Sequence, residues 1–267
     1  MVTADLDSLG IRPGHRVLDA GCGSGRHIAG LHRFSGIGIV GVDLDISDLE
    51  QARHRLELHD RLDEQVVSYW SLLAGDLQAL PFPNAAFDLV ICSEVMEHIP
   101  DHSRAVRELV RVLKPGASLV VSVPRTVPEA ICWRLSKTYG TEPGGHIRIY
   151  RAADVISLVE QAGARHNRTH YAHGLHSPYW WMKCLVGLNR ETALPVRLYH
   201  RFLTWDLMKK PRLTRWLEGI LDPLIGKSMV FYFTKTPRRR HGSKCRPPKA
   251  LEGQAPNRPR SRCHRSS

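Results

Sequence analysis

The sequence predicts an α/β fold in which a seven-stranded, mostly parallel sheet of the Rossmann-like type is covered by helices on both faces. Short apolar runs alternate with stretches of helical spacing over most of the first 170 residues, and this alternation is typical of parallel sheets. The first run leads into a turn with three glycines at every second position, Gly21, Gly23 and Gly25. Such a turn lets backbone amides and a helix N-terminus approach a nucleotide-like ligand.

The expected elements follow one another along the chain. Strands are predicted at residues 15–20, 36–43, 66–74, 87–92, 118–123, 165–171 and 227–235. Helices are predicted at residues 25–34, 47–61, 101–113 and 154–162, the third ended by Pro115 and Gly116. More than fifty residues separate the last two strands. We therefore divide the chain into a core at 1–172, a helical insertion at 173–226, the last core strand at 227–235 and a tail at 236–267.

The positive charge is concentrated in the tail. The formal net charge is +12, and from Lys235 onward the chain has eleven Lys and Arg but only one acidic residue, Glu252. The tail has almost no large apolar side chain, so we expect it to be disordered. It also has no aromatic side chains to stack on bases, so we expect no specific nucleic-acid partner.

Cysteine usage and hydropathy indicate the compartment. The six cysteines are scattered without a Cys-x-x-Cys pair, which argues against a disulfide framework or a structural zinc site. The first ten residues lack the apolar core of a signal peptide, and no stretch approaches the roughly 20 apolar residues that span a bilayer. We expect a cytoplasmic protein, or one that is peripheral on a membrane.

Three acidic residues, Asp19, Asp43 and Asp76, come at the ends of the first three predicted strands. Ligands of parallel sheets bind beyond these carboxyl ends. A dinucleotide fingerprint needs a third glycine where this chain has Arg26, and a carboxylate at Asp19 disfavours a pyrophosphate. S-adenosylmethionine suits these residues better, because it carries an ammonium group and no phosphate. The alternative, a dehydrogenase, predicts nicotinamide binding.

Five segments resemble, in order, the motifs of class I S-adenosylmethionine-dependent methyltransferases of the type 11 group: residues 17–25, 41–45, 75–82, 87–101 and 108–117. The resemblance covers about residues 10–165. It implies that Asp19 and the glycine turn hold the methionine end of the cofactor, Asp43 the ribose, and Asp76 with Leu77 the adenine. The expected cofactor-binding residues are Asp19, Gly21, Cys22, Gly23, Gly25, Asp43, Leu44, Asp76, Leu77 and Ser93.

A Glu-x-x-Glu-His segment, residues 94–98, follows the fourth predicted strand. Its spacing is similar to that of ubiquinone-biosynthesis O-methyltransferases and small-RNA 2′-O-methyltransferases, in which such residues bind a divalent cation. The resemblance implies a cation site made of Glu94, Glu97, His98 and His146. The alternative is a polar helix end without metal. In that case His98 or His146 is the candidate general base, because imidazole titrates near neutrality. The candidate catalytic residues are His98, His146 and Glu94.

The insertion interleaves Trp, Tyr, Met and Leu with Arg and Lys. It is interpreted as a helical lid over an apolar acceptor, as an amphipathic surface that contacts anionic lipid together with the tail, or as a packing or dimer interface. His173 and His176 could reach the acceptor from it.

From these observations we expect an enzyme that transfers a methyl group from S-adenosylmethionine to a small, apolar or lipid-linked acceptor, at oxygen. One alternative is a metal-assisted, catechol-type O-methyltransferase. An alternative of another class is a peripheral membrane or nucleic-acid binding protein that uses the basic tail.

Overall fold

The structure, a computed structural model, describes residues 2–62, 68–136, 138–139, 145–188, 190, 192–209 and 211–237. The chain divides into two units, Met1–Pro237 and Arg238–Ser267. The prediction of a disordered tail concerns residues of which all but Thr236 and Pro237 lie outside the described ranges.

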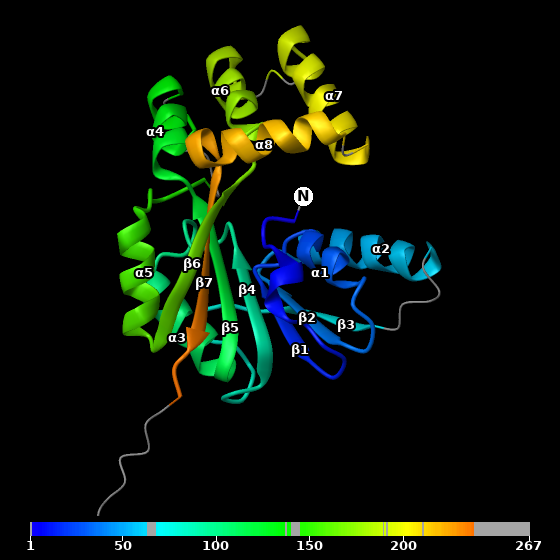
Figure 1. Ribbon diagram of the computed structural model, residues 1–267, viewed down its shortest axis with the longest axis vertical. Helices are drawn as coiled ribbons and strands as arrows, with labels where there is room; N and C mark the ends of the chain where they lie inside the picture. Colours follow the sequence, from blue (N-terminus) through cyan, green and yellow to red (C-terminus); the bar gives the residue numbers. More distant parts are fainter. Residues whose placement is uncertain are drawn as a thin grey trace, which may run out of the picture. The chain divides into compact units, whose positions relative to one another are not determined.

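One sheet of seven strands forms the centre of the first unit (Figure 1). Its strands are β1 (Arg16–Ala20), β2 (Gly38–Asp43), β3 (Tyr69–Ala74), β4 (Phe87–Ser93), β5 (Leu113–Pro124), β6 (Ala164–Ala172) and β7 (Ser228–Lys235). The strand order is β3-β2-β1-β4-β5-β7-β6. The first five strands are parallel, whereas β7 runs antiparallel to both β5 and β6. The predicted fold class is confirmed.

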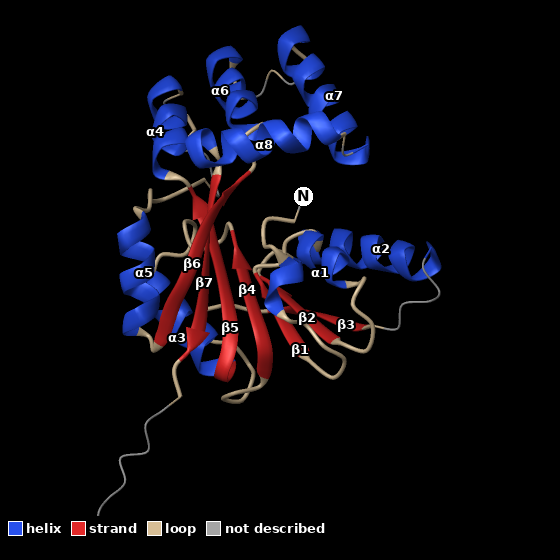
Figure 2. Cartoon of the chain, in the orientation of Figure 1, coloured by secondary structure: helices blue, strands red, loops and turns tan. Residues whose placement is uncertain are grey.

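Helices pack on both faces of this sheet (Figure 2). They are α1 (Arg26–Leu31), α2 (Ile46–Leu62), α3 (His102–Val112) and α5 (Ala152–Gln161), preceded by a short 3-10 helix, η1 (Leu6–Leu9), whereas α4 (Thr126–Leu135) lies beyond the end of the sheet, beside the helices of the insertion (Figure 1). Successive side chains of a strand point to opposite faces, so β1 contributes Leu18 to the cluster under α3 and α5, and Val17 to the cluster under α1, α2 and η1. The core therefore lies in two layers, one on each face.

Two local predictions were wrong. β5 begins at Leu113, five residues before the expected strand, because Leu113 already pairs with Phe87. Pro115 and Gly116 lie where the β4–β5 register shifts, and Gly116 has a φ of +78°; they interrupt the pairing rather than precede it. The sequence prediction also omitted α4, which begins two residues after β5 ends and carries Pro128 in its first turn, where a proline is tolerated.

Three helices separate β6 from β7 in the chain: α6 (His176–Val186), α7 (Leu194–Lys209) and α8 (Arg212–Ile225). They lie beyond the edge of the sheet at which β5 ends and β7 begins (Figure 1). The hydroxyl of Ser177 donates to the carbonyl of Ile225 at 2.6 Å, and Tyr199 donates to the carbonyl of Leu175 at 3.0 Å. These bonds connect α6 with α8 and α7 with the turn before α6. Within the described ranges, no helix is both long and apolar enough to cross a membrane.

Candidate functional site

The glycine turn after β1 is held tightly against its neighbours. The amides of Gly21 and Cys22 both donate to the carbonyl of Val42, at 2.7 and 3.0 Å. Gly21 has a φ of +75°, and a Cβ atom there would lie 2.3 Å from Cγ2 of Val95. Gly25, with a φ of +77°, forms the N-cap of α1. Only glycine fits at Gly21, and the turn brings bare backbone to the N-terminus of α1.

Asp19 is a buried carboxylate whose oxygens make no hydrogen bond with the described residues, although the charge of Arg26 acts on it. Its side chain is 1% exposed. Burial, together with the negative charge of Asp43, raises the pKa of Asp19 to about 7. A buried polar group without a partner is costly. A ligand that brings an ammonium group would supply the missing partner.

Asp43 ends β2 and is positioned by backbone amides. Its carboxylate accepts hydrogen bonds from the amide of Gly23 at 2.7 Å and from the amide of Asp45 at 3.0 Å. It therefore links the glycine turn to the loop that leads into α2. Leu44, the next residue, is 70% exposed.

The remaining predicted cofactor residues lie in the same region of the fold. Asp76 follows β3, and its carboxylate accepts from the amide of Gln78 at 2.8 Å, while Leu77 is buried. Ser93 ends β4 and shares a 2.7 Å hydrogen bond with the hydroxyl of Ser122. Burial raises the pKa of the Cys22 thiol, which disfavours the reactive thiolate. The ten residues thus lie at the carboxyl ends of β1 to β4 or in the loops directly after them.

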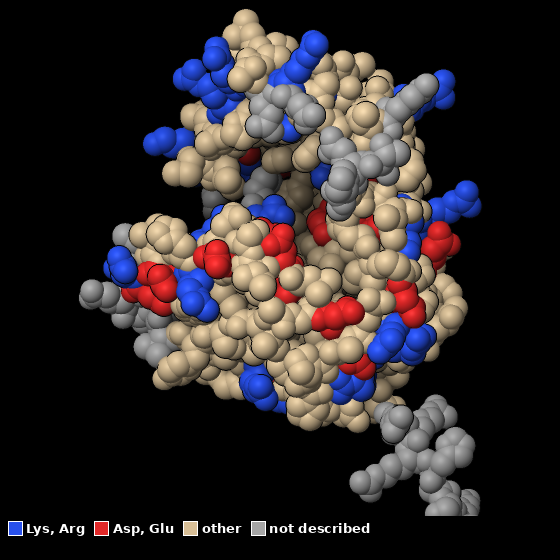
Figure 3. All heavy atoms as spheres, turned by 180° about the vertical axis from the view of Figure 1, so that it is seen from behind, with Lys and Arg blue, Asp and Glu red and all other residues tan. Residues whose placement is uncertain are grey.

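A cavity of about 450 Å³ adjoins this region. Figure 3 shows the surface hollowed, with acidic side chains at the edge of the hollow. None of the ten predicted cofactor residues lines the cavity. Its walls come from the N-terminal segment, the start of α1, the residues after β4, the segment before α5, the insertion and the beginning of β7: Thr3, Arg26, Glu94, Glu97, His98, His146, His173, His176, Tyr179, Trp180, His200, Leu203, Thr204, Leu207, Lys227 and Ser228.

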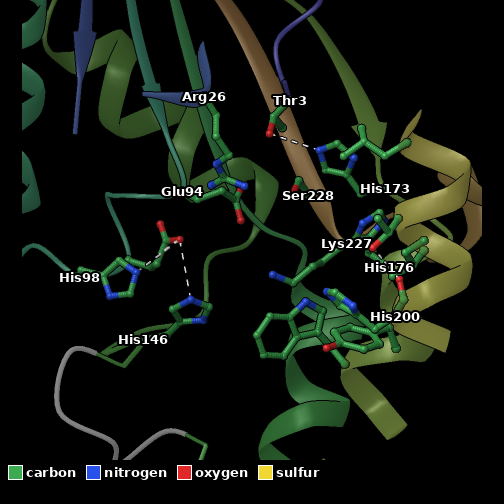
Figure 4. A pocket seen from close by; sticks show the side chains of 16 residues that line it. Thr3, Arg26, Glu94, His98, His146, His173, His176, His200, Lys227 and Ser228 are labelled. Atoms are coloured by element: carbon green, nitrogen blue, oxygen red, sulfur yellow. Dashed lines mark hydrogen bonds and ion pairs between the residues drawn. The ribbon is translucent and has the colours of Figure 1, made fainter. Parts of the chain in front are cut away.

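One wall groups Glu97 with two histidines (Figure 4). Glu97 is fully buried, and its Oε1 lies 3.9 Å from Nε2 of His146 and 4.0 Å from Nε2 of His98. Among the described residues, neither oxygen of Glu97 has a hydrogen-bond partner. Burial and the nearby charge of Glu94 raise the pKa of Glu97 well above its usual range. Ligand atoms of the three residues all lie within 4.8 Å of one another, which is compatible with a metal ion.

Glu94 is not a member of this group, although the sequence placed it there. Its φ is +56°, an unusual value for a residue with a side chain. Its amide donates to the carbonyl of Ser122 at 2.9 Å, and its Oε1 accepts from the hydroxyl of Ser122 at 2.9 Å. Glu94 is thus held toward β5, at another part of the cavity wall.

Glu129, which sequence reasoning missed, orients His146. Its Oε1 lies 2.5 Å from Nδ1 of His146 and accepts from the indole of Trp133 at 3.0 Å. Burial acts to raise the pKa of Glu129, but the hydrogen bond and charge of His146 outweigh it and hold that pKa below its usual range. Glu129 belongs to α4, the helix that the sequence prediction omitted, so only the fold brings it to His146.

The opposite wall carries imidazoles and cations (Figure 4). Nε2 of His173 lies 3.2 Å from the hydroxyl of Thr3. Burial, reinforced by the charge of Lys227, lowers the pKa of His176 to about 4, so this ring is neutral at physiological pH. The ammonium of Lys227 lies 4.8 Å from the ring centre of Trp180. Arg26 and Lys227 are further cavity residues that the sequence did not single out as site residues.

The comparisons agree with this architecture. A family model described as a methyltransferase domain matches residues 18–121. A ubiquinone biosynthesis O-methyltransferase of Alkalilimnicola ehrlichii is 35% identical over 123 residues, 46% of this chain and 47% of that protein. A sterol 24-C-methyltransferase of Aspergillus fumigatus is 30% identical over 233 residues, 82% of this chain and 55% of that protein.

A solved structure, a putative methyltransferase from Bacillus halodurans, has the same fold. Its TM-score is 0.57 at 20% identity, over 87% of this chain and 97% of that one. The chain spans about half the length of the curated relatives it matches. The glycine turn, the sheet order and the family match lead to one assignment: residues 18–121 of this chain belong to a methyltransferase domain, on a sheet with the fold of class I methyltransferases.

Proposed function

We propose that the protein transfers a methyl group from S-adenosylmethionine to a small, apolar or lipid-linked acceptor, at oxygen. The observation that carries the proposal is the composition of the cavity. Tyr179, Trp180, Leu203 and Leu207 give it an aromatic and apolar part among the imidazoles of the insertion, and another wall carries the group of Glu97, His98 and His146. The cavity thus combines an apolar part with convergent polar groups, and such a combination suits a small-molecule acceptor.

The described residues fit the cofactor. S-adenosylmethionine supplies, when bound, a methyl group attached to a positively charged sulfonium. Asp19 would pair with its ammonium group, because both oxygens of that buried carboxylate lack partners among the described residues. Arg26, at the first position of α1, would hold its carboxylate. Asp43, oriented by two backbone amides, would accept the ribose hydroxyls, and Asp76 with Leu77 would hold the adenine.

We assign the role of general base to His146. Because Nδ1 faces Glu129 at 2.5 Å, Nε2 is the nitrogen left toward Glu97 and the cavity. A neutral imidazole at this position can take the proton of an acceptor hydroxyl, which makes the oxygen a better nucleophile. His98, whose ring centre lies 4.9 Å from that of His146, is the second candidate. Binding the two reactants side by side, the donor at the glycine turn and the acceptor in the adjoining cavity, would supply much of the rate.

A metal-assisted reaction is the second candidate. The surroundings of Glu97 favour this metal-assisted reaction. Both of its buried oxygens lack hydrogen-bond partners in the described ranges, and one lies within 4.0 Å of two imidazole nitrogens. A cation held by Glu97, His98 and His146 would lower the pKa of a bound hydroxyl. Chelation separates the two candidates: the general-base reaction persists with chelator, whereas the metal-assisted one stops while binding of S-adenosylhomocysteine survives.

The acceptor class is tested directly by labelling. Donor with a labelled methyl group is incubated with the protein and a cell extract separated into lipid, small-molecule, RNA and protein pools. We expect label in the lipid pool or in apolar small molecules. Treatment with base then distinguishes methyl ethers, which keep the label, from methyl esters, which release it. Label confined to RNA or protein would contradict the proposed acceptor, and no transfer with retained S-adenosylhomocysteine binding would leave a binding protein as the alternative function.

A further inference from the structure

Two helices of the insertion expose large apolar side chains at helical spacing. Nineteen large apolar side chains are exposed in the described part of the chain, and ten of them fall between Leu185 and Leu224. We define the insertion face by eight of these: Leu194, Leu198, Trp205 and Met208 on α7, and Leu213, Trp216, Ile220 and Leu224 on α8. Their spacings of three, four and seven residues put them in one stripe along each helix.

The insertion face is not the packed side of either helix. On α7 the buried residues are Val196, Leu203 and Asp206, and on α8 they are Thr214 and Glu218. The exposed stripes lie on a different side of each helix from these buried residues. Within the stripes, Met208 is 75% exposed and Trp216 is 62% exposed. Concentrated exposed apolar surface of this kind marks an interaction site.

Charge identifies the partner. Among the described residues of α7 and α8, the exposed charged side chains are all positive: Arg197, Arg201, Lys209, Arg212 and Arg215. The acidic residues of these helices are not exposed. Asp206 and Glu218 are buried and pair with Arg215, and the half-buried Asp222 accepts a hydrogen bond from the amide of Gly174 at 2.6 Å. An apolar stripe bordered by cations complements anionic lipid headgroups above an acyl layer. A second copy of this face would meet like charge.

We propose that the insertion face docks on a membrane that contains anionic lipid, with α7 and α8 lying in the interface. The apolar side chains would enter the headgroup and acyl boundary, and the arginines and lysines would contact phosphates.

The docked helix also lines the cavity. His200, Leu203, Thr204 and Leu207 belong to α7, and Leu207 is 44% exposed as well as part of the cavity wall. A lipid-dissolved acceptor would therefore reach the cavity at the membrane surface. This step rests on the proposed function, whereas membrane binding does not.

Vesicle sedimentation with the full chain tests the proposal. Vesicles of phosphatidylcholine alone are compared with vesicles that also contain phosphatidylglycerol. We expect binding to the anionic vesicles, and a loss of about tenfold or more in affinity for the double variant Leu213→Ser with Trp216→Ser, which removes apolar contacts but no charge. A second double variant, Arg201→Glu with Lys209→Glu, should weaken binding to the anionic vesicles relative to the unchanged protein, which carries the same basic tail.

The matched control is the double variant Leu58→Ser with Tyr69→Ser, which removes exposed apolar side chains from α2 and β3. It should bind vesicles like the unchanged protein. The basic tail is present in every variant, so its charge cancels in the comparison. Equal vesicle affinity of all variants, or no binding to anionic vesicles, would overturn the proposal. The proposal would also be overturned if the unchanged protein were a dimer in size-exclusion chromatography and the Leu213→Ser, Trp216→Ser variant were a monomer that binds vesicles as well as the unchanged protein does. Affinity for S-adenosylhomocysteine reports folding of each variant and tests the proposed function separately.

Discussion

At the residue scale, we expect Asp19 to make cofactor binding dependent on pH. Its pKa is raised to about 7 by burial and by Asp43, and only the ionised form can pair with an ammonium group. A carboxyl group with this pKa is about one tenth ionised at pH ~6 and almost fully ionised at pH ~8. We expect calorimetry to show S-adenosylhomocysteine binding about tenfold tighter at pH ~8 than at pH ~6.

The raised pKa of Asp19 also affects the stability of the unliganded protein, which changes with pH in the opposite direction to cofactor binding. Because the folded-state pKa lies above the unfolded value of about 3.9, the unfolded chain loses its proton first, so Asp19 lowers stability as the pH rises from about 4 to about 7, with no further change above. Asp19→Asn is the control for both effects and should bind weakly at all pH values. Unchanged pH dependence in this variant would contradict the assignment.

Gly21 combines a positive φ with a close approach to Val95. In Gly21→Ala the new Cβ would lie 2.3 Å from a methyl carbon of Val95, and we expect the free energy of unfolding to fall by about 2–4 kcal/mol. Gly116→Ala is the matched control, because Gly116 has a φ of +78° and no atom within 4 Å of the new Cβ. It should cost about 1 kcal/mol. Urea denaturation measures both, and equal costs would refute the steric explanation.

Glu129 is a positioning residue for His146. Glu129→Gln removes the carboxylate that faces Nδ1, so we expect kcat to fall about 10- to 100-fold, with little change in the acceptor KM or in affinity for S-adenosylhomocysteine. Trp133→Phe removes a donor to Glu129 but keeps the carboxylate and should have a much smaller effect on kcat. A KM effect in place of a kcat effect would mean that Glu129 supports the fold of α4 rather than the base.

At the element scale, an arginine with two buried carboxylate partners connects α7 with α8. Arg215 of α8 donates to Asp206 of α7 and lies 2.6 Å from Glu218. Arg215→Met would leave two buried carboxylates without their cation, and we expect a loss of about 3 kcal/mol in stability, since breaking a buried pair exposes the desolvation cost of the remaining charge.

Because α7 lines the cavity, Arg215→Met should also raise the acceptor KM and leave affinity for S-adenosylhomocysteine unchanged. Arg201→Met removes an exposed arginine of α7, and its stability should change by no more than about 0.5 kcal/mol. Urea denaturation and steady-state kinetics provide the two readouts. Weaker cofactor binding by Arg215→Met would show that the insertion supports the glycine turn as well.

At the scale of the whole molecule, the positive charge and the catalytic unit are separate in the chain. The eleven Lys and Arg from Lys235 onward supply most of the net charge of +12, whereas the sheet and the cavity lie within Met1–Pro237. Removal of residues 238–267 should leave kcat and KM unchanged. Lost turnover in this variant would favour a function that depends on the tail.

Residues near one another in the chain were predictable, and residues joined by long loops were not. Asp19, Asp43 and Asp76 could be found because each directly follows or ends a strand, and the carboxyl ends of parallel strands meet at one edge. Glu97 and His98 are adjacent, so their shared location needed no fold. By contrast, Glu129 reaches His146 from α4, and Lys227 reaches the cavity from the position just before β7, and no local pattern marks either residue.

The sequence by itself determined the fold class, the methyltransferase domain and the candidate cofactor residues, because strand periodicity, glycine conformation and strand-end acids are local properties. Only the tertiary structure decided that Glu94 turns toward Ser122, that Glu129 orients His146 and that α6 and α7 wall the cavity. The physical reason is that these contacts join segments far apart in the chain. Which side of α7 faces the cavity and which side stays exposed depends on the packing of the whole insertion.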